Sequence, residues 1–307
     1  MCESMMGEKK SLVVVIVNYC RAQDTIECVE SILEKNEFFY DPAIIIIDNG
    51  SEDDSFEVFE KIYKDNKQII LEQTPNNLGF TGGYNFGIRI ALNYQIRWIL
   101  LLNNDTVIEK QAINLLMDPQ YDIIIPKILV QDKPNLVWSA GAKWRMFPPG
   151  VVIRGYLKKD HERYNKQEII KYATGCAIMI RREALIKLGG FDEEFGSYFE
   201  DNDFFYRAEK LELKILYQPK SIIYHKISKT YGNYSKIKWF LIGRNSVLFY
   251  LKENRFSIFT LAFFAIWVIV RESIKGKFYL VPSFIRGLFE GIQQIKSKNR
   301  KLNNENM

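Results

Sequence analysis

Four short, continuously apolar runs near the start of the chain constrain its fold more than any other feature. In chain order they are 12–18, 43–48, 68–73 and 97–103. Such runs are typical of strands buried on both faces, as in a parallel sheet covered by helices. Segments with helical periodicity lie between them, and each follows a potential cap, Asp24, Ser51 or Thr81. The alternation predicts an α/β fold with a Rossmann-like, doubly wound and mostly parallel sheet.

Composition excludes several other classes of protein. The chain has 307 residues, of which 47% are hydrophobic and 26% are charged, as in ordinary globular proteins. A chain of this size buries a core without disulfides or a structural metal. The four cysteines form no CxxC pair, and a polar stretch without the pattern of a secretory signal precedes the first apolar run. We therefore expect a cytoplasmic protein with neither a zinc ribbon nor a disulfide scaffold.

The basic charge lies in the last part of the chain. Residues 252–307 carry ten Lys or Arg and four Asp or Glu, whereas the rest is close to neutral. Aliphatic and aromatic neighbours favour an anionic membrane surface over nucleic acid as the partner of this tail. The apolar run 256–270 would form a helix about 22 Å long, shorter than the roughly 30 Å hydrocarbon core. The segment 281–292 has the spacing of an amphipathic helix.

Residues 236–300 are therefore expected to form a helical extension that lies at the membrane interface without crossing it. The alternative is that both apolar segments cover a soluble core.

Polar residues end three of the predicted strands. Asn18 ends the first, Asp48 the second, and 103–105 the fourth. Each of these residues taken alone is more typical of a turn or a helix cap than of a ligand contact. Ligands of doubly wound sheets bind beyond the carboxyl ends of the strands, so three polar ends at one edge indicate a polar ligand site. Asp48 can accept the ring N–H of uracil, thymine or guanine.

A glycine-rich run at 76–87, which includes Gly79 and Asn85, lets the backbone approach a phosphate or a ribose. Its spacing is not GxGxxG, and the chain has no GxxxxGK[ST] loop. Both facts disfavour a dinucleotide-binding dehydrogenase and a P-loop enzyme.

Two features suit metal and acid–base chemistry. Asp105 can hold Mg²⁺ or Mn²⁺ against a diphosphate, and His225 can complete the metal shell, although a lone histidine after a strand is more often structural. The segment 189–210 interleaves carboxylates with aromatic residues. It is either a solvated acidic face or the wall of a partly apolar cleft, where a carboxylate with raised proton affinity acts as a general base.

Eight fragments in order make the sequence resemble glycosyltransferase family 2, enzymes of the GT-A fold, and in particular its rhamnosyltransferase-like members. They are VVIVNY, IIIDNGSED, NLGFTGGYNFGI, LLNNDTVI, TGCAIMIRREAL, GGFDEEF, YFEDNDFFYR and IGRN. The resemblance runs from about residue 12 to residue 245. It departs from the family at Asn103, where many members have the first Asp of a DxD motif, and at Gly196, where an aromatic residue is usual.

The resemblance implies an inverting, metal-dependent transfer in which Asp201 deprotonates the acceptor hydroxyl and Asp105 and His225 hold Mg²⁺ or Mn²⁺. The donor-binding residues that it implies are Asn18, Asp48, Gly79, Asn85, Asn103 and Asp105. Acceptor or supporting contacts are expected from Glu200, Asp203, Arg207, Arg244 and Trp138. For Arg207 and Arg244, salt bridges and caps that hold the acidic helix are an equally good interpretation.

The expected organisation follows from these motifs. Residues 11–235 form a GT-A domain, with a nucleotide-binding half at 11–120 and an acceptor and catalytic half at 121–235. The expected donor is dTDP-rhamnose or, less favoured, a UDP-sugar. The expected acceptor is a polysaccharide or a polyprenyl-linked glycan, met by an enzyme attached peripherally to the cytosolic face of the cell membrane. No nucleic acid partner is expected.

Two alternatives remain. A nucleotidyltransferase-like enzyme would carry a glycine-rich basic loop after the first strand, where this chain has YCRAQDT. A non-catalytic, membrane-associated nucleotide-sugar-binding protein would not need Asp105, Asp201 and His225 together.

Overall fold

The computed structural model describes residues 12–35, 44–226, 235–252 and 255–305. Its sheet begins with four parallel strands in the spatial order β4, β1, β2, β3. They are β1 (Leu12–Asn18), β2 (Ile44–Asp48), β3 (Ile69–Gln73) and β4 (Trp98–Asn103). All four predicted strands are confirmed to within one residue at each end, because each is a local run of apolar residues.

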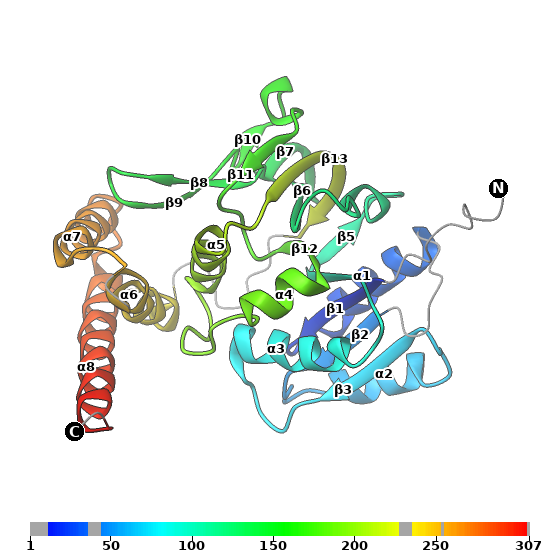
Figure 1. The fold of residues 1–307 in the computed structure, drawn as a ribbon, viewed down its shortest axis with the longest axis horizontal. Coiled ribbons are helices and arrows are strands. Elements are labelled where there is room, and N and C mark those ends of the chain that lie inside the picture. Colours follow the sequence, from blue (N-terminus) through cyan, green and yellow to red (C-terminus); the bar gives the residue numbers. More distant parts are fainter. Residues whose placement is uncertain (1–11, 36–43, 227–234, 253–254, 306–307) are drawn as a thin grey trace.

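Helices cover both faces of these strands. α1 (Ala22–Lys35) and α2 (Ser55–Tyr63) pack on one face, and α3 (Gly79–Leu92) packs on the other (Figure 1). The predicted helix starts were less accurate than the strands. Ser51 does not cap α2, since its hydroxyl donates to Asp48 Oδ1 at 2.5 Å and the helix begins four residues later.

The second half of the chain extends the same sheet with antiparallel and parallel strands. β12 (Ala177–Arg181) lies antiparallel between β4 and β6 (Ile123–Val130), and β13 (Ile215–His225) runs parallel to β6. The remaining strands of this sheet are β5 (Thr106–Ile108), β7 (Lys133–Ser139), β10 (Lys158–Lys159) and β11 (Glu168–Ile170). α4 (Arg182–Leu188) and α5 (Glu200–Lys210) join α3 on its face.

The register of this sheet gathers distant polar residues. Asn18 pairs with Asp48 across β1 and β2, and His225 pairs with Thr106 across β13 and β5. The latter pairing sets His225 beside Asp105, which is 120 positions earlier in the chain. A separate hairpin, β8 (Ala142–Arg145) and β9 (Gly150–Ile153), extends toward the C-terminal helices (Figure 1).

The C-terminal part of the chain is helical. It consists of α6 (Lys236–Leu251), α7 (Ile258–Ile274), a short 3₁₀ turn η4 (Phe278–Leu280) and α8 (Val281–Glu305). α6 and α8 cross closely because glycines remove the side chains between them: a Cβ atom on Gly243 would lie 2.1 Å from the carbonyl oxygen of Phe284. Among the described helices, none combines the length and apolarity needed to cross a bilayer.

These helices share a hydrophobic core with residues of β8 and of the segment before α5. Their buried side chains pack with Phe195 and Phe199, which precede α5, and with Trp144 of β8. The C-terminal helices are thus joined to the segment that begins α5 by apolar packing.

Candidate active site

A cavity of about 530 Å³ lies at the carboxyl ends of β1 and β4, next to the end of β13. Its lining includes eight of the thirteen residues predicted from the sequence. These are Asn18, Gly79, Asn103, Asp105, Trp138, Glu200, Asp201 and His225. The other five, Asp48, Asn85, Asp203, Arg207 and Arg244, lie outside the lining. The tertiary structure therefore gathers one site from six separate segments of the chain.

Asp48 differs from the expectation that it binds a base. It is fully buried and does not line the cavity. Its oxygens accept hydrogen bonds from Asn18 Nδ2 at 2.9 Å, from the Ser51 hydroxyl at 2.5 Å and from Gln73 Nε2 at 3.1 Å. Because its carboxylate is surrounded by these donors, Asp48 orients Asn18, and Asn18 is the residue that faces the cavity.

Asn49 next to it lines the cavity instead. Its Nδ2 atom donates to the carbonyl oxygen of Gly79 at 3.0 Å, and its Oδ1 atom accepts from the backbone N–H of Leu78 at 3.1 Å. These bonds hold the start of α3 against the cavity. Gly79 is needed there, since its φ is +72° and a Cβ atom would come 3.3 Å from Gly196.

Asn85 also differs from its predicted role as a donor contact. It lies one and a half turns into α3, and its amide donates to the Phe191 carbonyl at 2.8 Å and to Glu193 Oε1 at 2.9 Å. Its Oδ1 atom accepts from the Phe191 N–H at 2.9 Å. Asn85 thus anchors the loop before α5 rather than facing the cavity.

Asp105 and His225 meet at the floor of the cavity. His225 Nε2 lies 3.2 Å from Asp105 Oδ1, and both side chains are nearly buried. Trp138 stacks on the His225 ring at a centroid distance of 4.5 Å and fixes its plane. Burial alone lowers the pKa of His225, but the neighbouring Cys176 and the Asp105 carboxylate raise it to about 10, so a cation that binds here must displace the imidazolium proton.

This pair fits a divalent cation that takes most of its ligands from substrate. A carboxylate oxygen and an imidazole nitrogen point to one place on the cavity floor, and Asn103 lies at the end of the adjacent strand. Within the described residues there is no group of three or more His, Cys, Asp and Glu side chains arranged for a metal. Mg²⁺ and Mn²⁺ are commonly held by one or two protein ligands together with phosphate oxygens, so the donor set suits them.

Glu200 and Asp201 form another part of the cavity wall. Both lie in the first turn of α5 and line the cavity. Burial raises the pKa of Asp201 to about 6, although backbone N–H groups, including that of Asn202 at 2.8 Å from Oδ1, lower it. Burial and the neighbouring Asp201 carboxylate raise the pKa of Glu200 well above its ordinary value. Burial therefore raises the proton affinity of both carboxyl groups, and they titrate as an interacting pair.

The turn that presents this pair is strained. Tyr198 and Phe199 have φ values of 69° and 70°, a left-handed conformation that costs non-glycine residues energy. Asn245 on α6 is fully buried, and its Nδ2 atom donates to the carbonyl oxygens of Phe195 at 2.8 Å, Ser197 at 2.8 Å and Tyr198 at 2.6 Å. These bonds hold the turn in place.

Arg244, the preceding residue, also holds this loop. Its Nη2 atom donates to the carbonyl oxygen of Phe195 at 2.7 Å, and its Nε atom donates to Asn245 Oδ1 at 2.7 Å. The interpretation of Arg244 as a residue that supports the acidic helix therefore agrees with its contacts.

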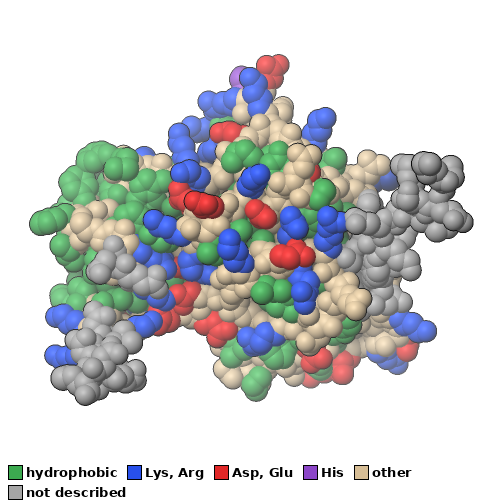
Figure 2. Space-filling model, viewed as in Figure 1, with side chains coloured by type: hydrophobic (Ala, Val, Ile, Leu, Met, Phe, Trp, Pro, Cys, Tyr) green, Lys and Arg blue, Asp and Glu red, His purple; other side chains and the backbone are tan. Residues whose placement is uncertain are grey.

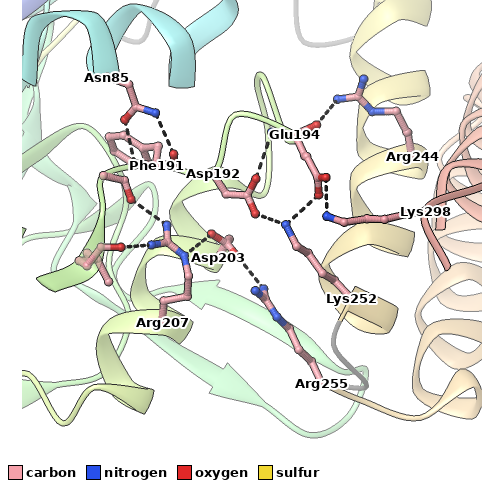
Figure 3. A network of polar contacts seen from close by, with 12 residues as sticks. Asn85, Phe191, Asp192, Glu194, Asp203, Arg207, Arg244, Lys252, Arg255 and Lys298 are labelled. Carbon is pink, nitrogen blue, oxygen red and sulfur yellow. Dashed lines mark hydrogen bonds and ion pairs between the residues drawn. The ribbon is translucent and has the colours of Figure 1, made fainter. Parts of the chain in front are cut away.

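Most other carboxylates of the acidic segment serve in ion pairs with the C-terminal helices (Figure 3). Lys252 Nζ contacts Asp192 and lies 2.7 Å from Glu194 Oε2, and Lys298 reaches Glu194 Oε1 at 2.7 Å. The sequence suggested a general base anywhere in this segment, and the structure leaves Glu200 and Asp201 as the members that face the cavity.

Asp203 and Arg207, which are expected to make acceptor or supporting contacts, make supporting ones. Asp203 is fully buried between Arg207, at 2.7 Å, and Arg255, at 2.5 Å. Arg207 also donates to the carbonyl oxygens of Leu188 and Gly190 at 2.7 and 2.9 Å. Both residues fix α5 to its neighbours, as the salt-bridge interpretation of Arg207 predicted.

Sequence reasoning missed several lining residues. The charged ones are Arg21, which pairs with Asp24, and Lys238 of α6, which lies 5.3 Å from the centre of the Tyr198 ring. Tyr156 and Ser197 line the cavity from loops. Arg21 follows the first polar strand end by three residues and could have been found by that position, whereas nothing local marks Lys238.

Comparisons with known proteins agree with this architecture. The family model described as glycosyl transferase family 2 matches residues 13–189, and a second, described as glycosyltransferase like family 2, matches residues 150–251. A hexosyltransferase of low-salt glycan biosynthesis, Agl10 of Haloferax volcanii, is 24% identical over 98% of this chain and 97% of its own length. The poly-beta-1,6-N-acetyl-D-glucosamine synthase of Staphylococcus aureus is 23% identical over 231 residues. The aligned region covers 72% of this chain and 53% of the length of that protein.

Solved structures show the same fold. GalNAc-T7 with UDP, GalNAc and Mn²⁺ aligns with a TM-score of 0.62 and 16% identity over 81% of this chain and 51% of the other. The mannosyltransferase PcManGT of Pyrobaculum calidifontis, in complex with GDP-Man and Mn²⁺, aligns with a TM-score of 0.55 and 12% identity over 93% of this chain and 88% of its own. TarS of S. aureus aligns with a TM-score of 0.54 and 18% identity over 92% and 80% of the two chains.

Proposed function

Because this chain belongs to glycosyl transferase family 2, has the GT-A fold and is a glycosyltransferase, we propose that it transfers a hexose in one inverting step from a nucleotide-sugar to a glycan acceptor. The observation that carries the proposal is the position of Asp201, whose side chain lines the same cavity as Asp105 and His225. A general base and a diphosphate site that share one cavity can hold the reacting sugar between them.

In the proposed mechanism, Asp201 accepts the proton of the acceptor hydroxyl as that oxygen attacks the anomeric carbon of the donor. Its pKa of about 6 makes it ionised at neutral pH yet basic enough for the task. Burial and the Asp201 carboxylate raise the pKa of the neighbouring Glu200, which disfavours a second negative charge beside the acceptor oxygen. The strained 198–199 turn and Asn245 fix the direction of the base.

Asp105 and His225 would hold Mg²⁺ or Mn²⁺, with Asn103 nearby. When bound, the cation supplies positive charge that offsets the charge of the departing nucleoside diphosphate. Trp138 keeps the His225 ring in plane by stacking on it. Asn18, oriented by Asp48, and the backbone around Gly79 would bind the nucleoside and ribose end of the donor.

For the donor we propose dTDP-rhamnose, with UDP-sugars as the second choice, on the strength of the rhamnosyltransferase-like motifs in the sequence. For the acceptor we propose a polysaccharide or a polyprenyl-linked glycan. The relatives named for glycan and poly-N-acetylglucosamine synthesis support a glycan acceptor.

We also propose that residues 11–235 form the transfer domain and that the helices of 236–300 attach it to the cytosolic face of the membrane. An apolar patch on the outer side of α7 supports this proposal. Phe259, Phe263 and Ile266 are 80%, 47% and 62% exposed, and the ring of Phe147, from the tip of the β8–β9 hairpin, lies 5.0 Å from that of Phe263. Figure 2 shows hydrophobic side chains gathered at this end of the molecule. A contiguous patch of this kind marks an interaction surface.

A flotation assay tests the attachment. We expect the protein to float with vesicles that contain anionic lipid and a Phe259→Asp variant to remain largely in the soluble fraction, because the new carboxylate must leave water or repel the surface. An Ile62→Asp variant, at an exposed position on α2, is the matched control. Equal flotation of the Phe259→Asp variant and the unmodified protein would contradict the assignment of this face.

The transfer itself is tested by Asp201→Asn with Glu200→Gln as the matched control. We expect turnover of the first variant to fall at least about a hundredfold, the low end for a lost general base, while nucleotide-sugar binding stays within a few fold. Turnover is followed by release of nucleoside diphosphate in a screen of dTDP-, UDP- and GDP-sugars with Mn²⁺. Near-normal turnover of Asp201→Asn, or a greater loss in Glu200→Gln, would overturn the role of Asp201.

A further inference from the structure

A second cavity of about 230 Å³ lies between α5, α6, α7 and the β8–β9 hairpin. We propose that it binds the phosphate group of a lipid-linked acceptor, an inference that rests on the proposed transfer function and specifies its acceptor. The cavity is smaller than the roughly 300 Å³ at which whole small-molecule sites begin. It therefore suits one group of a larger ligand.

Two arginines give the cavity its charge. Arg145 of β8 and Arg271 of α7 both line it, and their guanidinium carbons lie 5.6 and 4.3 Å from the centre of the Trp267 ring. Arg271 pairs with Glu272 at 2.6 Å, whereas no carboxylate in the described part of the chain pairs with Arg145. Two cations and one anion leave the cavity positive, and guanidinium groups bind phosphate in bidentate fashion.

The elements that carry these arginines also carry the apolar patch. Met146 and Phe147 follow Arg145 directly and are 81% and 70% exposed, and Ile266 precedes Trp267. A phosphate held by the arginines would leave its hydrocarbon chain beside these apolar side chains. Because a free anion gains nothing from the apolar neighbours, this juxtaposition favours a lipid phosphate over inorganic phosphate.

The second cavity adjoins the active site. Phe199 and Asn202 line it, whereas Glu200 and Asp201, which lie between them, line the active-site cavity. Strand β9 also borders both, since Val151 faces the second cavity and Ile153 the first. Two residues along a strand span about 7 Å. A sugar attached to a phosphate in the second cavity would therefore extend toward Asp201.

The test uses the full chain and farnesyl phosphate as the probe, with farnesol and inorganic phosphate as separate arms. By calorimetry, we expect farnesyl phosphate to bind at least about tenfold more tightly than farnesol or inorganic phosphate. Farnesol lacks the phosphate group, and inorganic phosphate lacks the hydrocarbon chain. Arg145→Gln, at an exposed side chain, should weaken that binding about tenfold, and Arg271→Gln should do the same if its unfolding temperature is preserved. Arg286→Gln makes the same charge change outside both cavities and should have no effect.

Binding of dTDP or UDP with Mn²⁺ separates this proposal from the transfer function. We expect it to be unchanged in all three variants. Farnesyl phosphate that binds Arg145→Gln as tightly as the unmodified protein, or no more tightly than inorganic phosphate, would overturn the lipid-phosphate site. Normal nucleotide binding and a large effect of Asp201→Asn would in that case leave the transfer function in place.

Discussion

Asn245→Ala removes the side chain that holds the turn before Glu200 and Asp201, and Asn245 itself does not line the cavity. The amide of Asn245 serves three carbonyl oxygens, at 2.6 to 2.8 Å, in the turn that contains two left-handed residues. A net contribution of about 1 kcal/mol for each hydrogen bond gives about 2–3 kcal/mol in total. Left-handed non-glycine residues cost on the order of 1–3 kcal/mol each, so the lost bonds are comparable with the strain that they oppose. We expect the turn to relax and Asp201 to move.

The two measurable consequences are a loss of stability and a loss of turnover. A cost of about 2 kcal/mol lowers the unfolding temperature of a chain of this size by about 3 °C. A displacement of about 1 Å in a catalytic group lowers turnover roughly a hundredfold. Donor affinity should stay within about threefold, since Asn18 and Asp105 belong to other segments of the chain than the turn that Asn245 holds.

Ser246→Ala is the matched control for this change. Ser246 is equally buried on the same helix, but its hydroxyl donates to the carbonyl oxygen of Gly243 within α6 at 2.7 Å. We expect a stability loss of about 1 kcal/mol with normal turnover. The assays are thermal unfolding, calorimetry of the donor and release of nucleoside diphosphate. Unchanged turnover of Asn245→Ala at 25 °C, or a parallel loss of turnover and donor affinity, would refute the positioning role.

Two further predictions concern protons and metal. Burial raises the pKa of Asp201 to about 6, and a general base must be ionised. Turnover should therefore fall as the pH drops through about 6 and level off above it. A pH profile that is the same in Asp201→Asn would contradict the assignment of Asp201 as the base. If Asp105 anchors the cation, chelation should abolish transfer, and Asp105→Ala should remove the metal-dependent part of nucleoside diphosphate binding. Equal affinity for nucleoside diphosphate in the presence and absence of Mn²⁺, measured by calorimetry, would count against a cation at Asp105.

The sequence alone determined the framework of this protein. Each of the first four strands is a continuous apolar run, and such a run is a local property that needs no knowledge of distant residues. The polar residues at the strand ends also pointed to the correct edge of the sheet, because parallel strands bring their carboxyl ends together. The resemblance to glycosyltransferase family 2 implied that Asp105, Asp201 and His225 share one site, and the structure brings all three to the lining of one cavity.

Only the tertiary structure decided which polar side chains face the cavity. Asp48 and Asn85 stand in the predicted motifs, yet each turns toward a partner from elsewhere in the chain, Asp48 toward Asn18 and Asn85 toward the backbone of Phe191. A motif specifies residue types and spacing, whereas the direction of a side chain depends on which donors and acceptors the fold places around it. The role of Asn245 and the second cavity also depend on the tertiary structure. Both result from the packing of α6 and α7 against residues that are 47 or more positions away in the chain.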